Sequence, residues 1–332
     1  MRTVHCIGIF HTQGNDEYSH CAFTQKTRRL VPMLSSLGYN VIYYGNAGFI
    51  PVNGPLDGTA NYTYVGIYDS MTLEHLRKKA ISELKTDGSY QGNLAKTEST
   101  LFKAFHSALV SKMHIHYEPG DIILHNFGIP HRQLAEVFPD AVHIEPGIGY
   151  NHVWAPYRIY ESYAWMAHVN GRNGENPRYG DFYVPNHFDT TVFKMPGAEV
   201  ERSGFVYMGR IQQDKGMDVI GRLSQTAWGV LTPTQYFEPF CGVAVEAALC
   251  GALPIMSDFG VFPEHLMRTG YGTVSRTLLD YAGMMEYALS MGFTDRLRMA
   301  DAYADKYGMD NVADDYRDVF AKILAIHEHG WE

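Results

Sequence analysis

The chain has 332 residues, more than one hydrophobic core usually serves, so two domains are expected. Apolar residues make up 45% and charged residues only 19%, which excludes a disordered, solvating protein. The formal net charge of -9, from 27 basic and 36 acidic residues, argues against a broad surface for a nucleic-acid backbone. Because a small basic cleft remains compatible with this charge, nucleic acid is disfavoured as a partner but not excluded.

The cysteines and the hydropathy pattern indicate a cytoplasmic protein. Cys6, Cys21, Cys241 and Cys250 form no C-x-x-C pair and have no zinc-site spacing, as expected of a reduced chain. No window approaches the roughly 20 uncharged apolar residues of a membrane-spanning helix. Some of the 16 histidines are closely spaced, such as His114 with His116 and His327 with His329, but histidines at such spacings are usually hydrogen-bonded structural residues or parts of solvated tails. We therefore expect neither a transmembrane segment nor a bound metal.

The first 150 residues alternate between apolar β-rich runs and helical periodicity. The pattern predicts strands at 4–10, 39–44, 121–125 and 141–145, with helices at 19–37, 72–85 and 97–112. Strands separated by helices pair in parallel through right-handed crossovers. This part of the chain is therefore predicted to form a doubly wound α/β domain.

A second α/β domain is predicted after an aromatic, irregular stretch. Its strands are expected at 205–209, 228–231 and 252–256, after a linker near 195–202, and the last helix at 310–327. We therefore divide the chain into three parts: 1–198, 199–309 and 310–332.

Several common catalytic motifs are absent from the sequence. The turn after the first strand contains a single glycine, Gly14, where a dinucleotide-binding G-x-G-x-x-G would need three. There is no P-loop G-x-x-x-x-G-K-[ST], no H-E-x-x-H and no G-x-S-x-G. Rossmann oxidoreductases and simple hydrolases are therefore excluded.

Residues 232–260 carry two carboxylates at a fixed spacing. Glu238 and Glu246 are eight positions apart, within E-P-F-C-G-V-A-V-E. Glu246 falls in a run of small apolar residues that predicts a helix over 243–250, ended by Gly251. A carboxylate in such a run is either buried against a partner or faces a cleft.

The turn before this helix offers backbone N–H groups to a ligand. Pro239 and Gly242 interrupt the chain, so the N–H groups of 240–243 point out of a helix N-terminus. That position suits a ligand that carries phosphate or hydroxyl groups. The alternative is structural: Glu238 caps the helix and Glu246 pairs with a basic residue.

Two cations follow the first strand of the second domain. Arg210 and Lys215 lie in the turn G-R-I-Q-Q-D-K-G, at the end of a strand where open α/β sheets bind ligands. Arg can bind phosphate oxygens through two hydrogen bonds, and Lys adds a point charge. The alternative is a solvated loop whose charges have no ligand.

Together these segments resemble the retaining GT-B glycosyltransferases of the glycosyltransferase group 1 family. The resemblance implies a GT-B fold, in which two doubly wound Rossmann-like domains face a central cleft. It is specific over 184–265 and general over 1–150. The matching segments are G-R-x-x-x-x-K-G (209–216), E-P-F-C-G-V-A-V-E-A (238–247), G-A-L-P-I-M-S-D-F-G (251–260) and V-P-N-H-F-D-T-T-V-F (184–193).

The resemblance implies a nucleotide-sugar donor on 199–309, an acceptor on 1–198, and a last helix (310–332) that packs back toward the first domain. Arg210 and Lys215 would hold the donor diphosphate and stabilise its developing charge, and Glu238 would accept from hydroxyls of the donor sugar. Glu246 would accept from the ribose. The other implied donor-binding residues are Gly14, Gly209, Phe240, Cys241 and Gly242.

The acceptor side is implied less directly. The candidates are His11, Asn15, His125 and Glu145, and the last departs from the family, which often has His there. The acceptor is a hydroxyl of a glycan, a metabolite or a modified nucleic-acid base. No cofactor is required, since Arg and Lys replace a metal and there is no D-x-D. Two alternatives remain: a non-catalytic protein that binds sugar nucleotides, and a phosphorylase-like GT-B enzyme.

The chain departs from the family between its two donor motifs. Relatives usually carry two further strand–helix units there, whereas here 216–225 leads almost directly into the strand at 228–231. Either the second domain is shortened, or residues are absent near Thr226 and Ala227. We expect the second.

Overall fold

The fold was analysed in a computed structural model. It describes residues 2–18, 21–50, 62–84, 96–207, 225, 227–232, 237–275 and 277–330. Gly209, Arg210, Lys215 and Thr226, which bear on the predictions above, lie outside the described residues. The expected absence of residues near Thr226 therefore stays a prediction.

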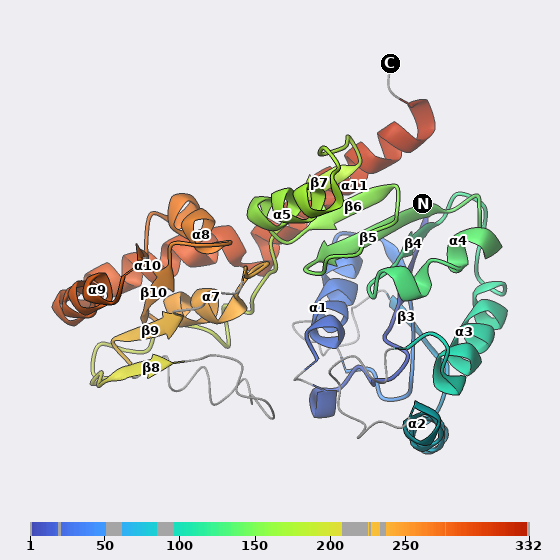
Figure 1. The fold of residues 1–332 in the computed structure, drawn as a ribbon, viewed down its shortest axis with the longest axis horizontal. Coiled ribbons are helices and arrows are strands. Elements are labelled where there is room, and N and C mark those ends of the chain that lie inside the picture. The colour runs from blue at the N-terminus through green and yellow to red at the C-terminus, as the bar shows by residue number, and fades with distance from the viewer. Residues whose placement is uncertain are drawn as a thin grey trace. The chain divides into compact units, whose positions relative to one another are not determined.

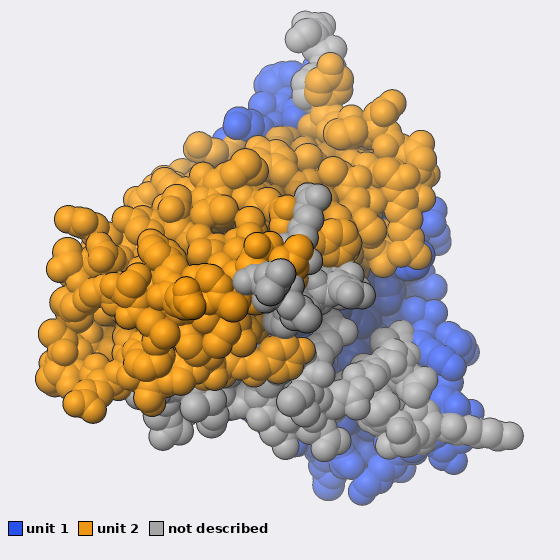
Figure 2. Space-filling view, turned by 60° about the vertical axis from the view of Figure 1, so that its left-hand side comes forward, with its two compact units in different colours: residues 1–148, 152–159, 320–332 blue, residues 149–151, 160–319 orange. Residues whose placement is uncertain are grey.

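The chain forms two compact units, coloured separately in Figure 2. Unit 1 comprises residues 1–148, 152–159 and 320–332, and unit 2 comprises 149–151 and 160–319. Residues 160–198 are thus counted with unit 2, whereas the sequence placed them before the domain boundary. The domain limits at 198 and 309 remain predictions.

The first sheet has the strand order β3-β2-β1-β4-β5-β6-β7. Its central pairs are parallel: Val4 of β1 lies opposite Val41 of β2 and Ile122 of β4. The strands are β1 (Thr3–Ile7), β2 (Asn40–Gly45), β3 (Tyr62–Gly66), β4 (Ile122–Leu124), β5 (Val142–Ile148), β6 (Tyr157–Tyr160) and β7 (Asp181–Tyr183). The parallel pairing of β2, β1, β4 and β5 is what the alternation of strands and helices predicted.

Helices cover both faces of this sheet in unit 1 (Figure 1). One face packs on α2 (Ser70–Leu84), α3 (Thr100–Met113) and the short α4 (Leu134–Val137), through a core that includes Phe105 and Leu109. On α1 (Ala22–Ser36), Val31 and Leu34 are fully buried, and the helix contacts β2 and β3. Two 3-10 turns complete the described unit: Asp16–Tyr18 and Ile129–His131.

The second sheet has the order β11-β10-β9-β8, and its three pairs are parallel. Its strands are β8 (Phe205–Tyr207), β9 (Gly229–Thr232), β10 (Leu253–Ser257) and β11 (Thr273–Ser275). The helices of this part are α5 (Tyr163–Asn173), α7 (Gly242–Leu249), α8 (Phe262–Thr269), α9 (Leu278–Ser290), α10 (Phe293–Tyr307) and α11 (Met309–His329), whose last turns belong to unit 1. In the described residues no helix is both long and apolar enough to cross a membrane.

Candidate functional site

The carboxyl edge of the second sheet brings two segments of the predicted site together. The loop after β10 ends at Gly260, whose backbone φ of 64° is one that glycine adopts readily. A Cβ atom at Gly260 would lie only 3.1 Å from the amide nitrogen of Glu238 and 3.3 Å from its carbonyl oxygen. The absence of a side chain at 260 therefore allows the backbone of Glu238 to approach the loop after β10 closely.

The turn between Glu238 and α7 is strained at Cys241. This residue has φ 58° and ψ 69°, and it is the one non-glycine residue with positive φ in the described chain. Such a conformation costs on the order of 1–3 kcal/mol and persists only where its surroundings hold it. Cys241 is the N-cap of α7, yet its side chain makes no capping hydrogen bond. The side chain of the cap thus leaves the first N–H groups of α7 to other acceptors.

Three side chains fix the position of this turn through hydrogen bonds. Ser162 Oγ donates to the carbonyl of Pro239 at 2.6 Å. His265 Nε2 donates to the carbonyl of Phe240 at 2.6 Å, and His265 Nδ1 accepts from the hydroxyl of Tyr307 at 2.7 Å. Because burial lowers the pKa of His265 to about 4, its imidazole is neutral at physiological pH. The two hydrogen bonds fix its tautomer and so the position of the turn.

Packing completes the support of the turn. The ring of Phe188 stacks on that of Phe240, with centroids 6.0 Å apart, and a Cβ atom at Gly242 would lie 3.2 Å from Phe188. Ser162 is also the N-cap of α5, where it accepts from the amide of Trp165 at 3.0 Å. The conformation of the turn is therefore stabilised by residues of α5, α8 and α10 as well as by its own sequence.

The structure places Glu238, Phe240, Cys241, Gly242 and Glu246 on one turn and the helix that follows it, as predicted. Glu246 is 8% exposed within α7, and Glu238 is half-buried. A buried carboxylate requires polar partners, since burial without them costs several kcal/mol. Of the other four donor-side residues, Gly14 lies in unit 1, and Gly209, Arg210 and Lys215 lie outside the described residues.

In unit 1, Gly14 is required by packing. A Cβ atom there would lie 2.5 Å from the ring of Phe49, and the Gly14 carbonyl accepts from the amide of Ile50 at 2.6 Å. Asn15 donates to the side chain of Gln13 at 3.0 Å. Gly14 and Asn15 thus belong to a tightly packed loop after β1.

The histidines predicted on the acceptor side are core residues. His11 is 3% exposed, and burial, with a smaller contribution from Arg77, lowers its pKa to about 3. His125 is fully buried. His143 Nε2 donates to the carbonyl of Phe138, so His143 Nδ1 carries no proton. This nitrogen therefore accepts a hydrogen bond from His125 Nε2 at 2.9 Å. Burial holds the pKa of His125 well below its usual value.

Glu145 also has partners within unit 1. It is fully buried, and its Oε2 accepts from the amides of Trp154 and Ala155 at 2.8 and 2.9 Å. The indole of Trp154 in turn packs edge-on against His125, with centroids 4.6 Å apart. Glu145 therefore orders the turn that leads into β6.

Four supporting residues were not predicted from the sequence as parts of the site: Ser162, Gly260, His265 and Tyr307. Gly260 lies inside one of the quoted motifs, and Ser162 precedes α5 as an N-cap residue does, so local signals existed for both. His265 and Tyr307 are 42 positions apart and have no such signal. Within the described residues, no group of three or more His, Cys, Asp or Glu side chains is arranged to hold a metal ion.

Comparison with solved structures confirms the predicted GT-B fold. Anabaena HepE in complex with UDP and glucose has a TM-score of 0.62 and 11% identity, covering 97% of this chain and 100% of its own. Sucrose-phosphate synthase from Thermosynechococcus elongatus has a TM-score of 0.60 and 13% identity, covering 98% and 100%. The glycosyltransferase AviGT4, involved in avilamycin A biosynthesis, has a TM-score of 0.57 and 14% identity, covering 98% of each chain. No protein-family model matches the sequence, and no curated protein matches it.

Proposed function

We propose that this protein transfers a sugar from a nucleoside diphosphate sugar to a hydroxyl acceptor, with retention at the anomeric carbon. The observation that carries the proposal is the strained turn at 238–242, which lies with Glu238 and a helix N-terminus at the carboxyl edge of the second sheet and leads into the helix that contains the buried Glu246. Proteins with the same fold include glycosyltransferases, and HepE has been solved with UDP-glucose. A UDP-sugar is therefore the first donor to test.

Each group of the site has a role in this reaction. Arg210 and Lys215 bind the diphosphate, and the N–H groups at the start of α7 add partial positive charge. Glu238 accepts from hydroxyls of the donor sugar, and Glu246 from those of the ribose. The bond from the anomeric carbon to the diphosphate oxygen breaks, while a bond to the acceptor oxygen forms on the same face. The acceptor proton passes to the departing diphosphate, so no separate carboxylate base is needed.

The test is release of nucleoside diphosphate from a panel of UDP-, GDP- and ADP-sugars. We expect slow release from one donor, as water replaces the acceptor, and thermal stabilisation by the same donor. Release without an added acceptor identifies the nucleotide and the sugar in a single assay. The proposal would be contradicted if no donor in the panel released nucleoside diphosphate and none stabilised the protein. Stabilisation without release, even with a panel of sugar acceptors, would favour the non-catalytic alternative.

A matched pair of glycine variants tests whether the turn carries the activity. Gly260→Ala and Gly270→Ala both place a side chain at positive φ, 64° and 74°, so each should lose about 1 kcal/mol of stability. Only at 260 would the new Cβ press on Glu238, since nothing lies within 4 Å of a Cβ at 270. We expect Gly260→Ala to lower kcat/KM by up to about 100-fold through misplacement of the turn, and Gly270→Ala to leave it unchanged. Equal kcat/KM in the two variants at matched stability would show that the turn is not where the donor binds.

A further inference from the structure

The residues on either side of Glu238 both contact α5. Ser162, the N-cap of this helix, donates to the carbonyl of Pro239 at 2.6 Å. On the other side, the ring of Phe237 stacks on that of His168, with centroids 4.6 Å apart and an angle of 18° between the planes. Residues of α5 thus contact the chain directly before and directly after the carboxylate that is proposed to bind the donor sugar.

The ring of His168 is held in turn by Trp165, which lies three residues earlier on α5. These two rings stack with centroids 4.9 Å apart and an angle of 26° between the planes. Trp165 is 1% exposed, its amide donates to Ser162 Oγ at 3.0 Å, and its indole Nε1 donates to the carbonyl of Tyr150 at 3.3 Å. Phe237 lies farther from Trp165 itself, at 6.2 Å between centroids. His168 therefore makes the closer aromatic contact between α5 and Phe237.

The loop after β10 packs against the same segment. Phe259 lies edge-on to Phe237, with centroids 5.1 Å apart. A Cβ atom at Gly260 would lie 3.6 Å from the carbonyl carbon of Phe237 and 3.1 Å from the amide nitrogen of Glu238. The backbone at 237–239 is therefore packed against both α5 and this loop, and these contacts set the direction in which the Glu238 side chain leaves the backbone.

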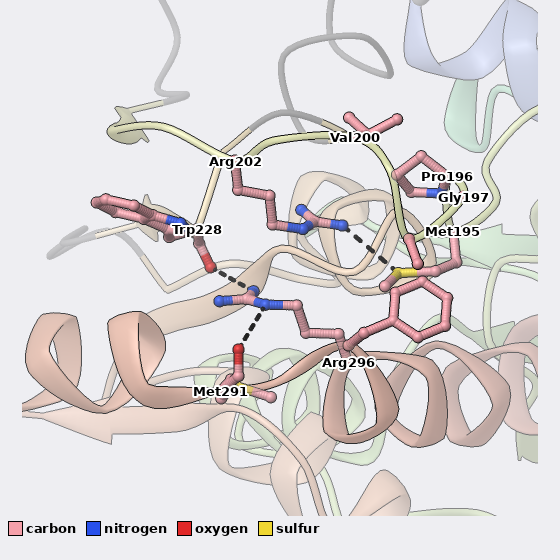
Figure 3. Close-up of a pocket in the computed structure, with 10 residues that line it drawn as sticks. Met195, Pro196, Gly197, Val200, Arg202, Trp228, Met291 and Arg296 are labelled. Carbon is pink, nitrogen blue, oxygen red and sulfur yellow. Dashed lines mark hydrogen bonds between the residues drawn. The ribbon is translucent and has the colours of Figure 1, made fainter.

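The helix that follows the turn is fixed separately, at its carboxyl end. Arg202 and Arg296, which both line the hollow in Figure 3, donate to the backbone carbonyls of residues 250 and 251 at 2.9 and 2.8 Å. Cations in this position interact favourably with the dipole of α7. Glu246 lies on α7 between this end and the turn. Its position therefore depends less on α5 than the position of Glu238 does.

We propose that His168 is a positioning residue for the donor sugar: it fixes Phe237, and through it Glu238, without a comparable effect on Glu246. This inference rests on the proposed function, in which Glu238 accepts from hydroxyls of the donor sugar and Glu246 accepts from those of the ribose. His168 therefore acts on the sugar half of the donor and not on its nucleotide half. A side chain that only stabilised the fold would affect the binding of both halves equally.

The experiment compares the affinity of the full chain for a nucleotide sugar with its affinity for the free nucleoside diphosphate, by titration calorimetry. UDP-glucose and UDP are the first pair, replaced by the matching pair if the donor panel selects another nucleotide sugar. The variant is His168→Gln, which removes the ring at a half-buried helical position where glutamine is well tolerated. We expect Kd for the nucleotide sugar to rise about 10-fold through misplacement of Glu238, and Kd for the nucleoside diphosphate to change less than about 2-fold.

Two further variants separate positioning from stability. His168→Phe keeps a ring in contact with Trp165 and Phe237 and should bind both ligands as the wild type does. Val169→Ala is the matched control: Val169 is fully buried on α5 but adds no ring to these contacts, so its truncation should lower Tm and leave both Kd values unchanged.

A double variant tests whether the effect passes through Glu238. Once Glu238→Gln has removed the carboxylate, His168→Gln should cost no further affinity for the nucleotide sugar. Full additivity of the two changes, or an equal rise of both Kd values in His168→Gln alone, would overturn the role of His168 and leave the proposed function intact. If the wild type bound neither nucleotide sugars nor nucleoside diphosphates, the proposed function itself would fail, and this inference with it.

Discussion

Replacing Lys215 with alanine should slow the release of nucleoside diphosphate by about 100- to 1000-fold. The proposed reaction leaves negative charge on the departing diphosphate, and removing one group that stabilises such charge typically costs this much in kcat. Arg210→Ala should have an effect of the same order. The measurement is initial rate against donor concentration, which separates kcat from KM. A fall in kcat with little change in KM is expected, because the charge develops in the transition state.

Arg298→Ala is the matched control for this loss. Arg298 is also a cation of unit 2, but its side chain is 67% exposed and it pairs with Asp295 one helical turn away at 3.8 Å. Exposed pairs of this kind contribute little to stability. We expect Arg298→Ala to keep wild-type rates. If Lys215→Ala kept more than a tenth of the wild-type rate, Lys215 would not be the group that stabilises the diphosphate.

Acidification from pH 8 to pH 5 should destabilise the protein by about 6 kcal/mol through three buried histidines alone. Burial lowers the pKa of His11 and His131 to about 3 and that of His265 to about 4, against 6.5 when unfolded. Above pH 6.5 neither state is protonated at these sites, and the stability is fully present. As the pH falls below 6.5 the unfolded chain binds protons that the native state does not, so each site costs about 2 kcal/mol at pH 5.

The loss should be larger in unit 1 than in unit 2. His11 and His131 belong to unit 1, where burial also lowers the pKa of His106, His125 and His143. Domain stabilities of 5–15 kcal/mol leave little reserve against such a cost. Hydrogen exchange at pH 5 should therefore show the loss of protection in peptides of unit 1 before those of unit 2. Simultaneous loss in both units would contradict the assignment of the acid sensitivity to unit 1.

His131→Phe provides the single-residue test of this prediction. His131 is 1% exposed, and among the described residues neither of its ring nitrogens has a hydrogen-bond partner. Phenylalanine keeps a ring beside Phe127, 6.2 Å away between centroids, and cannot be protonated. Urea unfolding should show the variant more stable than the wild type by about 2 kcal/mol at pH 5. His329→Gln, whose side chain is 78% exposed, should not change the stability, and an equal effect of both variants would rule out burial as the cause.

Local sequence signals predicted the elements that carry buried, continuous apolar runs. β1, β2, β4 and β5 of the first sheet lie within or close to their predicted ranges, because a strand buried on both faces is apolar along its length. The turn and helix at 238–246 were also predicted from a local signal, because proline, glycine and small residues mark the start of a helix. The GT-B fold was predicted from the resemblance of four sequence motifs to those of a known family, and the order of these motifs can be seen without a structure.

Elements without that pattern were missed. β3 lies at the edge of its sheet, and its Thr63 and Tyr64 are exposed, so no apolar run marks it. The stretch that seemed irregular in sequence contains β6, α5 and β7. Its aromatic residues fit a helix or a strand equally well until the partner surface is known.

The sequence by itself therefore determined the fold class and the turn at Cys241, because both depend on residues close together in the chain. The tertiary structure decided what holds the turn, since His265 and Tyr307 meet Phe240 only when α8 and α10 pack beside it. It also decided that His125 and Glu145 have hydrogen-bond partners inside unit 1. A residue type at the end of a strand shows what chemistry is available, but burial and hydrogen-bond partners, which come from distant segments, decide whether a ligand can use it.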